Sequence, residues 1–519
     1  MGIHFNSASD LLALMNAREI SSVELLRHFI QQIESFDGRI NAVVSRDFER
    51  ALDRAKAADG TRARSAVGEL GRLHGLPMTV KESFDVSGLP TSWGTVSYAG
   101  NVAKRDADAV ARLVGAGAVV FGKTNVPEGL ADVQTSNPLH GRTSNPWDHA
   151  RTCGGSSGGS AAALAAGFTA VELGSDLAGS LRVPAHFCGV FSHKPSYGLV
   201  PQNGHSIDAD ESQTDMTVLG PMARSASDLR LLLEILAGPG GFDAGGWVLQ
   251  LPKARGNRLS DFRVAVLPNH GACEVDQGIQ ASIENLARAL QRSGAEVDFD
   301  VEWPVDLELC FQDFMMMTRA VGSRRASPDL LKRMSDEAMT LRSDDRSYRA
   351  AIRRAAGMSH HAWLSLHSRR SEYRAAWQRF FRSYDVVLCP VHASLAFVHD
   401  TAGPRENRLL DINGRQQDYS QSLFWMAIAG LSYLPSTVRP VSLVGGLPTG
   451  VQIIGPYLED MTTLRFAELL DELCPHLTYP FQAAGSRSSV DGQGSTGRQA
   501  QTDGSGIQPG ILRTEGEKA

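Results

Sequence analysis

The chain has 519 residues, of which 42% are apolar, and its formal net charge at pH 7 is −6. A chain of this length and composition can bury a large core, either as one big domain or as two. The modest charge comes with no basic run and no aromatic–basic stripe, which argues against a nucleic-acid groove or an anionic membrane surface. We therefore expect a small neutral molecule as the partner and no nucleic acid.

The cysteines give no sign of a metal site or a disulfide framework, because the 6 of them occur singly and no C-x-x-C pair is present. We expect buried free thiols in a reducing cytoplasm. The N-terminal stretch MGIHFNSASDLLALMNAREISSVELL lacks the pattern of a signal peptide. No apolar run reaches the length of about 18 residues that a membrane helix needs. A cytoplasmic protein without a membrane segment is expected.

Short apolar runs alternate with longer helical patterns along most of the chain. Helix starts are predicted near the N-terminus, at Asp10 and at the pattern Ser21-Ser22-x-Glu24. The alternation that follows favours an α/β fold with helices on both faces of a central sheet. The predicted strands are Met78–Lys81, Ala118–Gly122, Thr169–Gly174, Arg263–Leu267, Val386–Cys389 and Val451–Gly455.

Two later segments differ from this alternation. The segment from about 306 to 382 is charged and periodic, which predicts several helices laid beside the core. Residues 485–519 are rich in Gly, Ser and Gln with almost nothing to bury, which predicts a disordered tail.

A lysine stands at the end of the first predicted strand, in the stretch GLPMTVKE from Gly75 to Glu82. Buried lysine loses its charge easily and can then act as a base, so Lys81 is a candidate catalytic residue. A lysine met alone in this position is more often ion-paired or extended to solvent.

The stretch CGGSSGGSAAA, from Cys153 to Ala163, is unusually rich in glycine and serine. Its centre fits the G-x-S-x-G pattern of a nucleophile elbow, but an elbow needs an apolar strand before the serine, and here a loop precedes it. A phosphate-binding loop is excluded because no lysine follows the glycines. By itself the stretch predicts a turn in which Ser160 caps a helix over 160–166.

A second serine-containing stretch follows. The strand-like run TAVELG leads into Ser175–Pro184, so that Ser180 lies where a strand ends and a helix begins. Consecutive backbone N–H groups from Leu177 to Ser180 can point into one concavity there and bind an oxyanion, as acyl transfer requires.

Together these stretches resemble the amidase signature family. That family has a lysine, a bridging serine in a GGSSGGS loop, and a nucleophilic serine 24 residues later, which is the separation of Ser156 and Ser180. Lys81 matches the family lysine. The resemblance extends to about Gln482 and includes the stretches KTNVPE, SNPWDHARTCGGSSGGSAAALAAG, GSDLAGSLRVPAHFCGVFSHKPSYG and GLPTGVQIIGPYLEDMTTLRFAELL.

The resemblance implies the amidase signature fold, with a mixed, mostly parallel sheet covered by helices on both faces. It also implies one catalytic domain over 1–484. In the mechanism that it implies, neutral Lys81 takes a proton from Ser156, whose peptide bond is cis in the family, and Ser156 takes one from Ser180. Ser180 Oγ attacks the carbonyl, and the backbone amides of Leu177, Ala178, Gly179 and Ser180 hold the oxyanion. Water then hydrolyses the acyl-enzyme.

Supporting residues follow from the same resemblance. Asp176 and Arg182 match positions flanking the nucleophile, where they stabilise the loop and the lysine–serine cluster. Ser157 is expected to form hydrogen bonds within the loop, and Ser175 stands where the family usually has threonine. Ala178 departs from the family, in which glycine is commoner, and this puts the loop geometry in question. Cys153 is expected to be structural, because no histidine base accompanies it.

No cofactor and no metal is implied. The histidines His360, His361 and His367 lie on a predicted helix without an H-E-x-x-H pattern, so we interpret them as packing or solvent residues.

The expected reaction is hydrolysis of the C–N bond of a small, apolar or aromatic linear amide. Candidate pocket segments are the stretch around Trp93, Gln134–His140, the cluster Met315-Met316-Met317 and Leu423–Trp425. Other interpretations remain open: the glutaminase subunit of a tRNA-dependent amidotransferase, an ester or carbamate hydrolase, and a non-catalytic binding protein of the same fold. The intact Lys81, Ser156 and Ser180 argue against the non-catalytic binding protein. A homodimer is possible.

Overall fold

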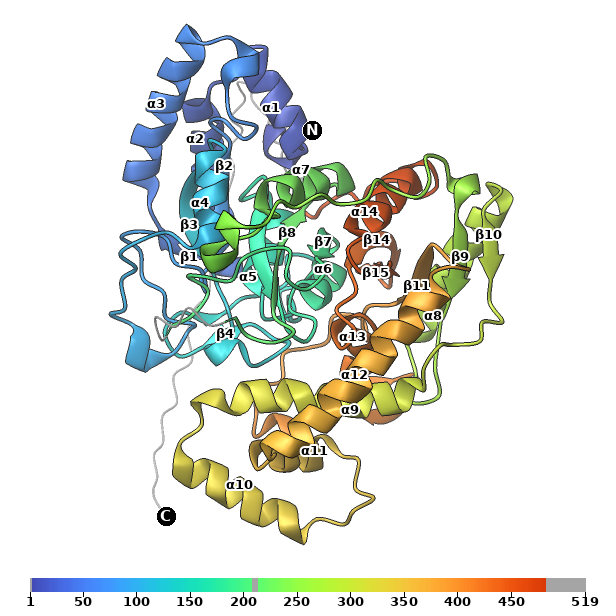
Figure 1. Ribbon diagram of the computed structural model, residues 1–519. Coiled ribbons are helices and arrows are strands. Elements are labelled where there is room, and N and C mark those ends of the chain that lie inside the picture. The colour runs from blue at the N-terminus through green and yellow to red at the C-terminus, as the bar shows by residue number, and fades with distance from the viewer. Residues whose placement is uncertain (1, 208–212, 482–519) are drawn as a thin grey trace, which may run out of the picture.

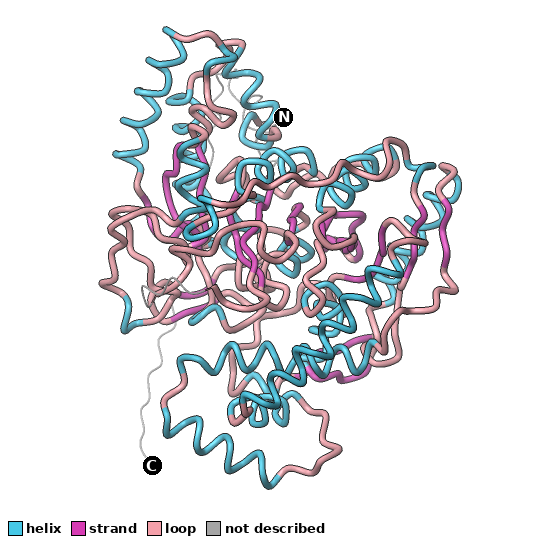
Figure 2. Tube along the Cα trace, in the orientation of Figure 1, coloured by secondary structure: helices cyan, strands magenta, loops and turns pink. Residues whose placement is uncertain are grey.

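The computed structural model describes residues 2–207 and 213–481. Its strands lie mostly in the middle of the molecule and its helices around them (Figures 1 and 2). The strands are β1 Val43–Arg46, β2 Pro77–Lys81, β3 Val119–Thr124, β4 Ser136–Asn137, β5 Gly141–Arg142, β6 Glu172–Asp176, β7 Phe191–Lys194, β8 Val218–Ala223, β9 Arg263–Val266, β10 Glu296–Asp298, β11 Val386–Pro390, β12 Leu409–Ile412, β13 Arg415–Asp418, β14 Ser436–Val444 and β15 Leu447–Ile454.

The helices pack around these strands. They are α1 Ala8–Asn16, α2 Ser22–Ile40, α3 Phe48–Arg64, α4 Asp108–Gly115, α5 Gly158–Ala165, α6 Arg182–Cys188, α7 Ala226–Leu236, α8 Gln277–Arg292, α9 Leu307–Gly322, α10 Pro328–Thr340, α11 Tyr348–Ala356, α12 His360–Phe380, α13 Phe424–Gly430 and α14 Asp460–Leu469.

An eight-stranded mixed sheet, in the order β10-β9-β11-β15-β14-β7-β8-β6, forms the centre of the fold. Helices α6, α7, α8 and α14 pack against it, so the expected α/β architecture with helices flanking a mixed sheet is confirmed. The expectation that the sheet is mostly parallel is wrong. Only the pairs β10–β9 and β9–β11 are parallel, whereas the remaining neighbours pair antiparallel.

The physical reason lies in the connections. The hairpin from β14 to β15 turns through only Gly445 and Gly446, both with positive φ, and a connection this short forces antiparallel pairing. Sequence patterns show that strands such as these are buried, but burial alone does not reveal their direction.

A smaller sheet, in the order β1-β3-β2, lies beside the large one. Its strand β2 packs next to β6, the edge strand of the large sheet, and the Thr79 N–H donates to Thr169 Oγ1 at 3.0 Å. Both β2 and β6 are buried along their whole lengths. This contact brings the end of β2, with Lys81, to the segment that follows β6.

Local sequence signals explain several boundaries. Ser21 and Glu24 form the predicted capping box of α2. Asp10 lies in the first turn of α1, whose N-cap is Ser7. Helix α5 begins two residues before the predicted Ser160, with Ser157 at its N-cap position. Strand β6 begins at Glu172, three residues later than predicted.

The segment 306–382 contains helices α9 to α12, as expected. Helices α9, α10 and α11 lie at the bottom of Figure 1, and α12 runs from there up toward β11. The predicted tail, 485–519, lies outside the described residues. Within the described part of the chain, no helix is both long and apolar enough to cross a membrane.

Candidate active site

Lys81 is the centre of a buried polar cluster. It ends strand β2, its side chain is fully buried, and its Nζ donates to Ser156 Oγ at 2.7 Å and to Ser175 Oγ at 2.8 Å. Burial lowers the pKa of Lys81 from 10.5 to about 7, and the carboxylates of Asp176, Glu172 and Glu82 oppose this shift. A large fraction of the amine is therefore uncharged near neutral pH, as a general base requires.

Ser156 is positioned by the buried loop before α5. The Gly155–Ser156 peptide bond is cis. Gly155 has no room for a side chain, because a Cβ there would lie 2.6 Å from the carbonyl oxygen of Asp132. The next residue, Ser157, joins this loop to the second serine segment: its N–H donates to the Ser180 carbonyl at 3.1 Å, and its Oγ donates to the Ser175 carbonyl at 3.3 Å.

Ser180 lies on the open side of the cluster. It is half-buried, whereas Ser156 is only 1% exposed. The structure thus brings Lys81, Ser156 and Ser175 together through their side chains, and it brings Ser180 to them through its backbone. Among the described residues, no hydrogen bond joins Ser156 Oγ and Ser180 Oγ.

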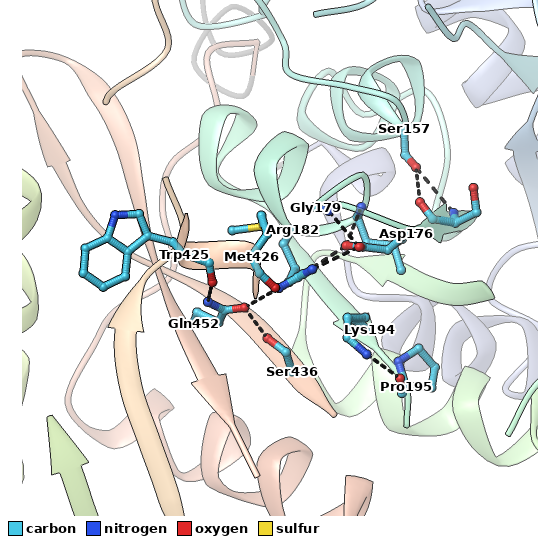
Figure 3. Close-up of polar contacts among 12 residues, drawn as sticks. Ser157, Asp176, Gly179, Arg182, Lys194, Pro195, Trp425, Met426, Ser436 and Gln452 are labelled. Atoms are coloured by element: carbon cyan, nitrogen blue, oxygen red, sulfur yellow. Dashed lines mark hydrogen bonds and ion pairs between the residues drawn. The ribbon is translucent and has the colours of Figure 1, made fainter. Parts of the chain in front are cut away.

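The segment between β6 and α6 is held by a buried ion pair (Figure 3). Arg182 Nε and Nη2 each lie 3.0 Å from a carboxylate oxygen of Asp176, and both side chains are inaccessible to solvent. Burial would raise the pKa of Asp176, but the charge and hydrogen bonds of Arg182, together with Lys194 and the Gly179 amide, outweigh burial and lower this pKa to about 2. Arg182 Nη1 also donates to Gln452 Oε1 at 2.7 Å, which ties the segment to β15.

The backbone amides after β6 are the candidate oxyanion-binding groups. One of the four differs from expectation: the Gly179 N–H already donates to Asp176 Oδ1 at 2.8 Å. The amides of Leu177, Ala178 and Ser180 make no hydrogen bond to any residue that the structure describes.

The backbone angles explain which of these residues must be glycine. Gly179 has φ 100°, and a Cβ there would lie 2.5 Å from Met426 Sδ. Ala178 is not among the residues with positive φ, so alanine fits at this position without strain.

A cavity of about 1040 Å³ opens among helices α9, α11 and α12. Met315 and Met316 line it, together with Phe311, Leu366, Asp418, Ser420 and Gln421. None of Lys81, Ser156 and Ser180 is among the lining residues, so the assignment of Met315 and Met316 to the substrate pocket stays a prediction. Met317 and Trp425 are instead buried in the core, as is Trp93, whose Nε1 donates to the Ser83 carbonyl at 3.2 Å.

The cysteines within this fold are free and buried, as expected. Burial raises the pKa of the Cys153 thiol to about 12, so this residue is a protonated packing group beside the serine loop. In the described ranges, no group of three or more His, Cys, Asp or Glu side chains is arranged to hold a metal ion.

Three residues of this region were not found by sequence reasoning: Gln452, Met426 and Glu172. Gln452 and Met426 lie 270 and 244 residues beyond Arg182 in the sequence, and no local pattern marks them. Glu172 could have been noticed from the sequence, because a charged residue inside the apolar run TAVELG indicates a buried charge that needs an explanation.

Comparison with known proteins gives consistent matches over almost the whole chain. The family model described as Amidase matches residues 24–464. An indoleacetamide hydrolase of Bradyrhizobium diazoefficiens is 34% identical over 88% of this chain and 84% of its own length. A glutamyl-tRNA(Gln) amidotransferase subunit of Thioalkalivibrio sulfidiphilus is 32% identical over 90% of this chain and 96% of its own.

A solved structure of an amidase superposes with a TM-score of 0.73 at 28% identity, covering 90% of this chain and 100% of that one. The likeness therefore includes both the serine–lysine segments and the fold that joins them. This chain belongs to the amidase family.

Proposed function

We propose that the protein is an amidase that hydrolyses the C–N bond of a small linear amide through an acyl-enzyme on Ser180. The observation that carries the proposal is the fully buried Lys81, whose Nζ lies 2.7 Å from Ser156 Oγ and whose pKa burial lowers to about 7. A serine hydroxyl is a weak nucleophile unless a base removes its proton, and an uncharged buried amine supplies that base.

The proposed relay runs from the buried cluster to the open side. Lys81 accepts the proton of Ser156, Ser156 accepts that of Ser180, and Ser180 Oγ attacks the carbonyl carbon. The proton returns along the same route to the departing nitrogen, and water then releases the acid. The proposed approach of Ser180 to Ser156 accompanies substrate binding, since hydrogen bonds of this kind are often long in ligand-free enzymes.

In the proposed transition state, the amides of Leu177, Ala178 and Ser180 hold the oxyanion. Gly179 has a different role in this proposal. Its amide, together with that of Leu181, anchors the segment to the Asp176 carboxylate, so that the other three amides stay fixed. Preorganised donors cost no reorganisation during the reaction.

The proposed substrate has an apolar or aromatic group. The 34% identity to an indoleacetamide hydrolase supports this choice. We propose a cytoplasmic location, which suits the free buried cysteines.

A second candidate function is the glutaminase component of a tRNA-dependent amidotransferase, working with partner proteins. The 32% identity to the glutamyl-tRNA(Gln) amidotransferase subunit of Thioalkalivibrio sulfidiphilus supports it. Esters and carbamates are further candidate substrates, because the acylation step is the same.

The proposal is tested with the purified full chain alone. Assays would compare indole-3-acetamide, aliphatic amides, aryl amides, anilides, glutamine, esters and carbamates. We expect hydrolysis of aromatic amides without any partner. Activity confined to glutamine and requiring added partner proteins would favour the second candidate.

The roles of the residues are tested with Ser180→Ala, which should abolish hydrolysis, and with Lys81→Ala, which should remove most of it. Ser371→Ala, an exposed serine on α12, is the matched control and should keep full activity. A fluorophosphonate probe followed by peptide mass spectrometry should label Ser180. Labelling of Ser156, or full activity of Ser180→Ala, would show that the assignment is wrong.

A further inference from the structure

Glu172, the first residue of β6, is a buried carboxyl group that forms no ion pair with any residue that the structure describes. Its side chain is fully inaccessible to solvent. Thr79 Oγ1 donates to its Oε1, while its Oε2 has no hydrogen-bond partner among the described residues. A buried carboxylate in such surroundings is costly, so the group tends to keep its proton.

Glu172 belongs to the same seam between strands as Lys81. We define the β2–β6 seam as Thr79 and Lys81 on β2 with Thr169, Glu172 and Ser175 on or before β6. Three hydrogen bonds cross it: Thr79 N–H to Thr169 Oγ1, Thr79 Oγ1 to Glu172, and Lys81 Nζ to Ser175 Oγ. Thr79 precedes Lys81 by two residues, so the carboxyl and the amine are held by one stretch of strand.

The groups that face Glu172 come from three further elements. Thr79 and Lys81 lie on β2, Thr124 on β3 and Ser160 on α5, and the last two hydroxyls bond each other at 2.8 Å. Burial raises the pKa of Glu172 to about 8, and the hydroxyls of Thr79, Ser160 and Thr124 oppose this shift.

The other acids and bases close to Lys81 already have partners. Asp176 is paired with Arg182. Glu82 accepts hydrogen bonds from Ser92 and from the amide of Trp93. Lys123, on β3, donates to Pro90 and Thr91. Glu172 is thus the acid whose proton can balance that of Lys81.

An ammonium beside a carboxylate and an amine beside a carboxylic acid contain the same number of protons and the same net charge. Burial disfavours the two charges and attraction between them favours them, so the balance of these two effects decides which form the pair takes. We propose that Glu172 is a positioning residue that shares one proton with Lys81 and keeps this buried amine basic. The proposal rests on the role of Lys81 as the base in the proposed function.

The variant Glu172→Gln tests the proposal, because glutamine keeps the size and the bond to Thr79 but cannot carry the charge. In the wild type, the acid limb of kcat/KM should be broad, since the two apparent pKa values belong to the pair. In Glu172→Gln, the fall of kcat/KM at low pH should follow the binding of a single proton. The midpoint of this fall should move about one pH unit lower, because Lys81 loses the attraction of the carboxylate. The plateau should fall about three- to tenfold, because the amine is a weaker base.

Leu173→Ala is the matched control, since it weakens the same strand without changing any charge. It should lower the melting temperature and leave the limb in place. A limb that does not move in folded Glu172→Gln would overturn the proposal, because a purely structural role predicts that result.

A second measurement uses the wild-type full chain and does not depend on activity. Infrared spectra recorded from about pH 6 to about pH 10 should show a buried carboxylic acid that loses its proton in this range. Absence of such an acid at about pH 7 would overturn the proposal even if the variant does not fold. Full activity of Lys81→Ala would instead refute the relay itself, so the two failures are distinguishable.

Discussion

Replacing Asp176 with asparagine removes the negative charge from a fully buried ion pair and leaves Arg182 without its counter-charge. The side chains of Asp176 and Arg182 are 1% and 0% exposed, so water cannot solvate the remaining guanidinium. The change also weakens two hydrogen bonds from the amides of Gly179 and Leu181 to the carboxylate, at 2.8 and 3.1 Å. These bonds fix the turn that carries Ser180.

The loss of stability caused by Asp176→Asn follows from the pKa of Asp176 and from the cost of leaving Arg182 unpaired. The pKa of Asp176 falls from 3.8 to about 2, because Arg182, with Lys194 and the Gly179 amide, outweighs the effect of burial. Such a shift corresponds to roughly 2 to 3 kcal/mol of interaction with the folded protein. Leaving a buried partner charge unpaired typically costs about 3 to 5 kcal/mol. We therefore expect Asp176→Asn to lower the free energy of unfolding by about 3 to 5 kcal/mol.

Urea unfolding followed by circular dichroism measures this loss, with Asp53→Asn as the matched control. Asp53 forms an exposed pair with Lys56, at 78% and 61% exposure, so its loss should change stability by no more than about 0.5 kcal/mol. The double variant Asp176→Asn/Arg182→Met should be more stable than the sum of the single changes predicts, by about 2 kcal/mol. A cost below about 1 kcal/mol for Asp176→Asn, with additive single changes, would refute the reasoning.

Two further outcomes are expected. The acid limb of kcat/KM should have its midpoint near pH 7, with activity rising as the pH increases, because burial lowers the pKa of Lys81 to about 7 and only the neutral amine accepts a proton. A pH–rate profile measures this midpoint. An acid limb near the ordinary lysine pKa of 10.5 would contradict the prediction. Gly179→Ala should reduce kcat at least about tenfold and destabilise the fold by roughly 1 to 3 kcal/mol, because φ is 100° and the new Cβ would lie 2.5 Å from Met426 Sδ. The control is Gly445→Ala, at a position with positive φ but open space, which separates backbone strain from the steric clash. Equal losses of kcat in both variants would argue against a local role of Gly179.

The candidate site was largely visible in the sequence because its parts are short and local. The loop before α5 and the turn after β6 each need glycines and hydroxyls at fixed offsets, and such offsets are readable without a structure. Lys81 at the end of a buried strand was readable for the same reason. Roles that the resemblance implied for Ser156 and Ser180 stay predictions, and so does the disordered tail.

The arrangement of the sheet was not visible. Alternation of apolar runs and helices predicted the α/β class, and this is confirmed, but the direction of pairing was wrong. Strand direction depends on which strands become neighbours, and β7, β8 and β14 were not among the predicted strands. Their polar residues, such as His193 and Arg439, are buried through partners that come from α14 and the residues after it.

The sequence by itself thus determined the class of the fold, the free cysteines and the segments that carry Lys81, Ser156 and Ser180. Only the tertiary structure decided that Ser175 completes the hydrogen bonds of Lys81, that Gln452 anchors Arg182, and that Glu172 lies in the seam with the lysine. The reason is physical: a local pattern records what a segment can form, whereas the protonation of a buried group depends on charges brought to it from distant segments.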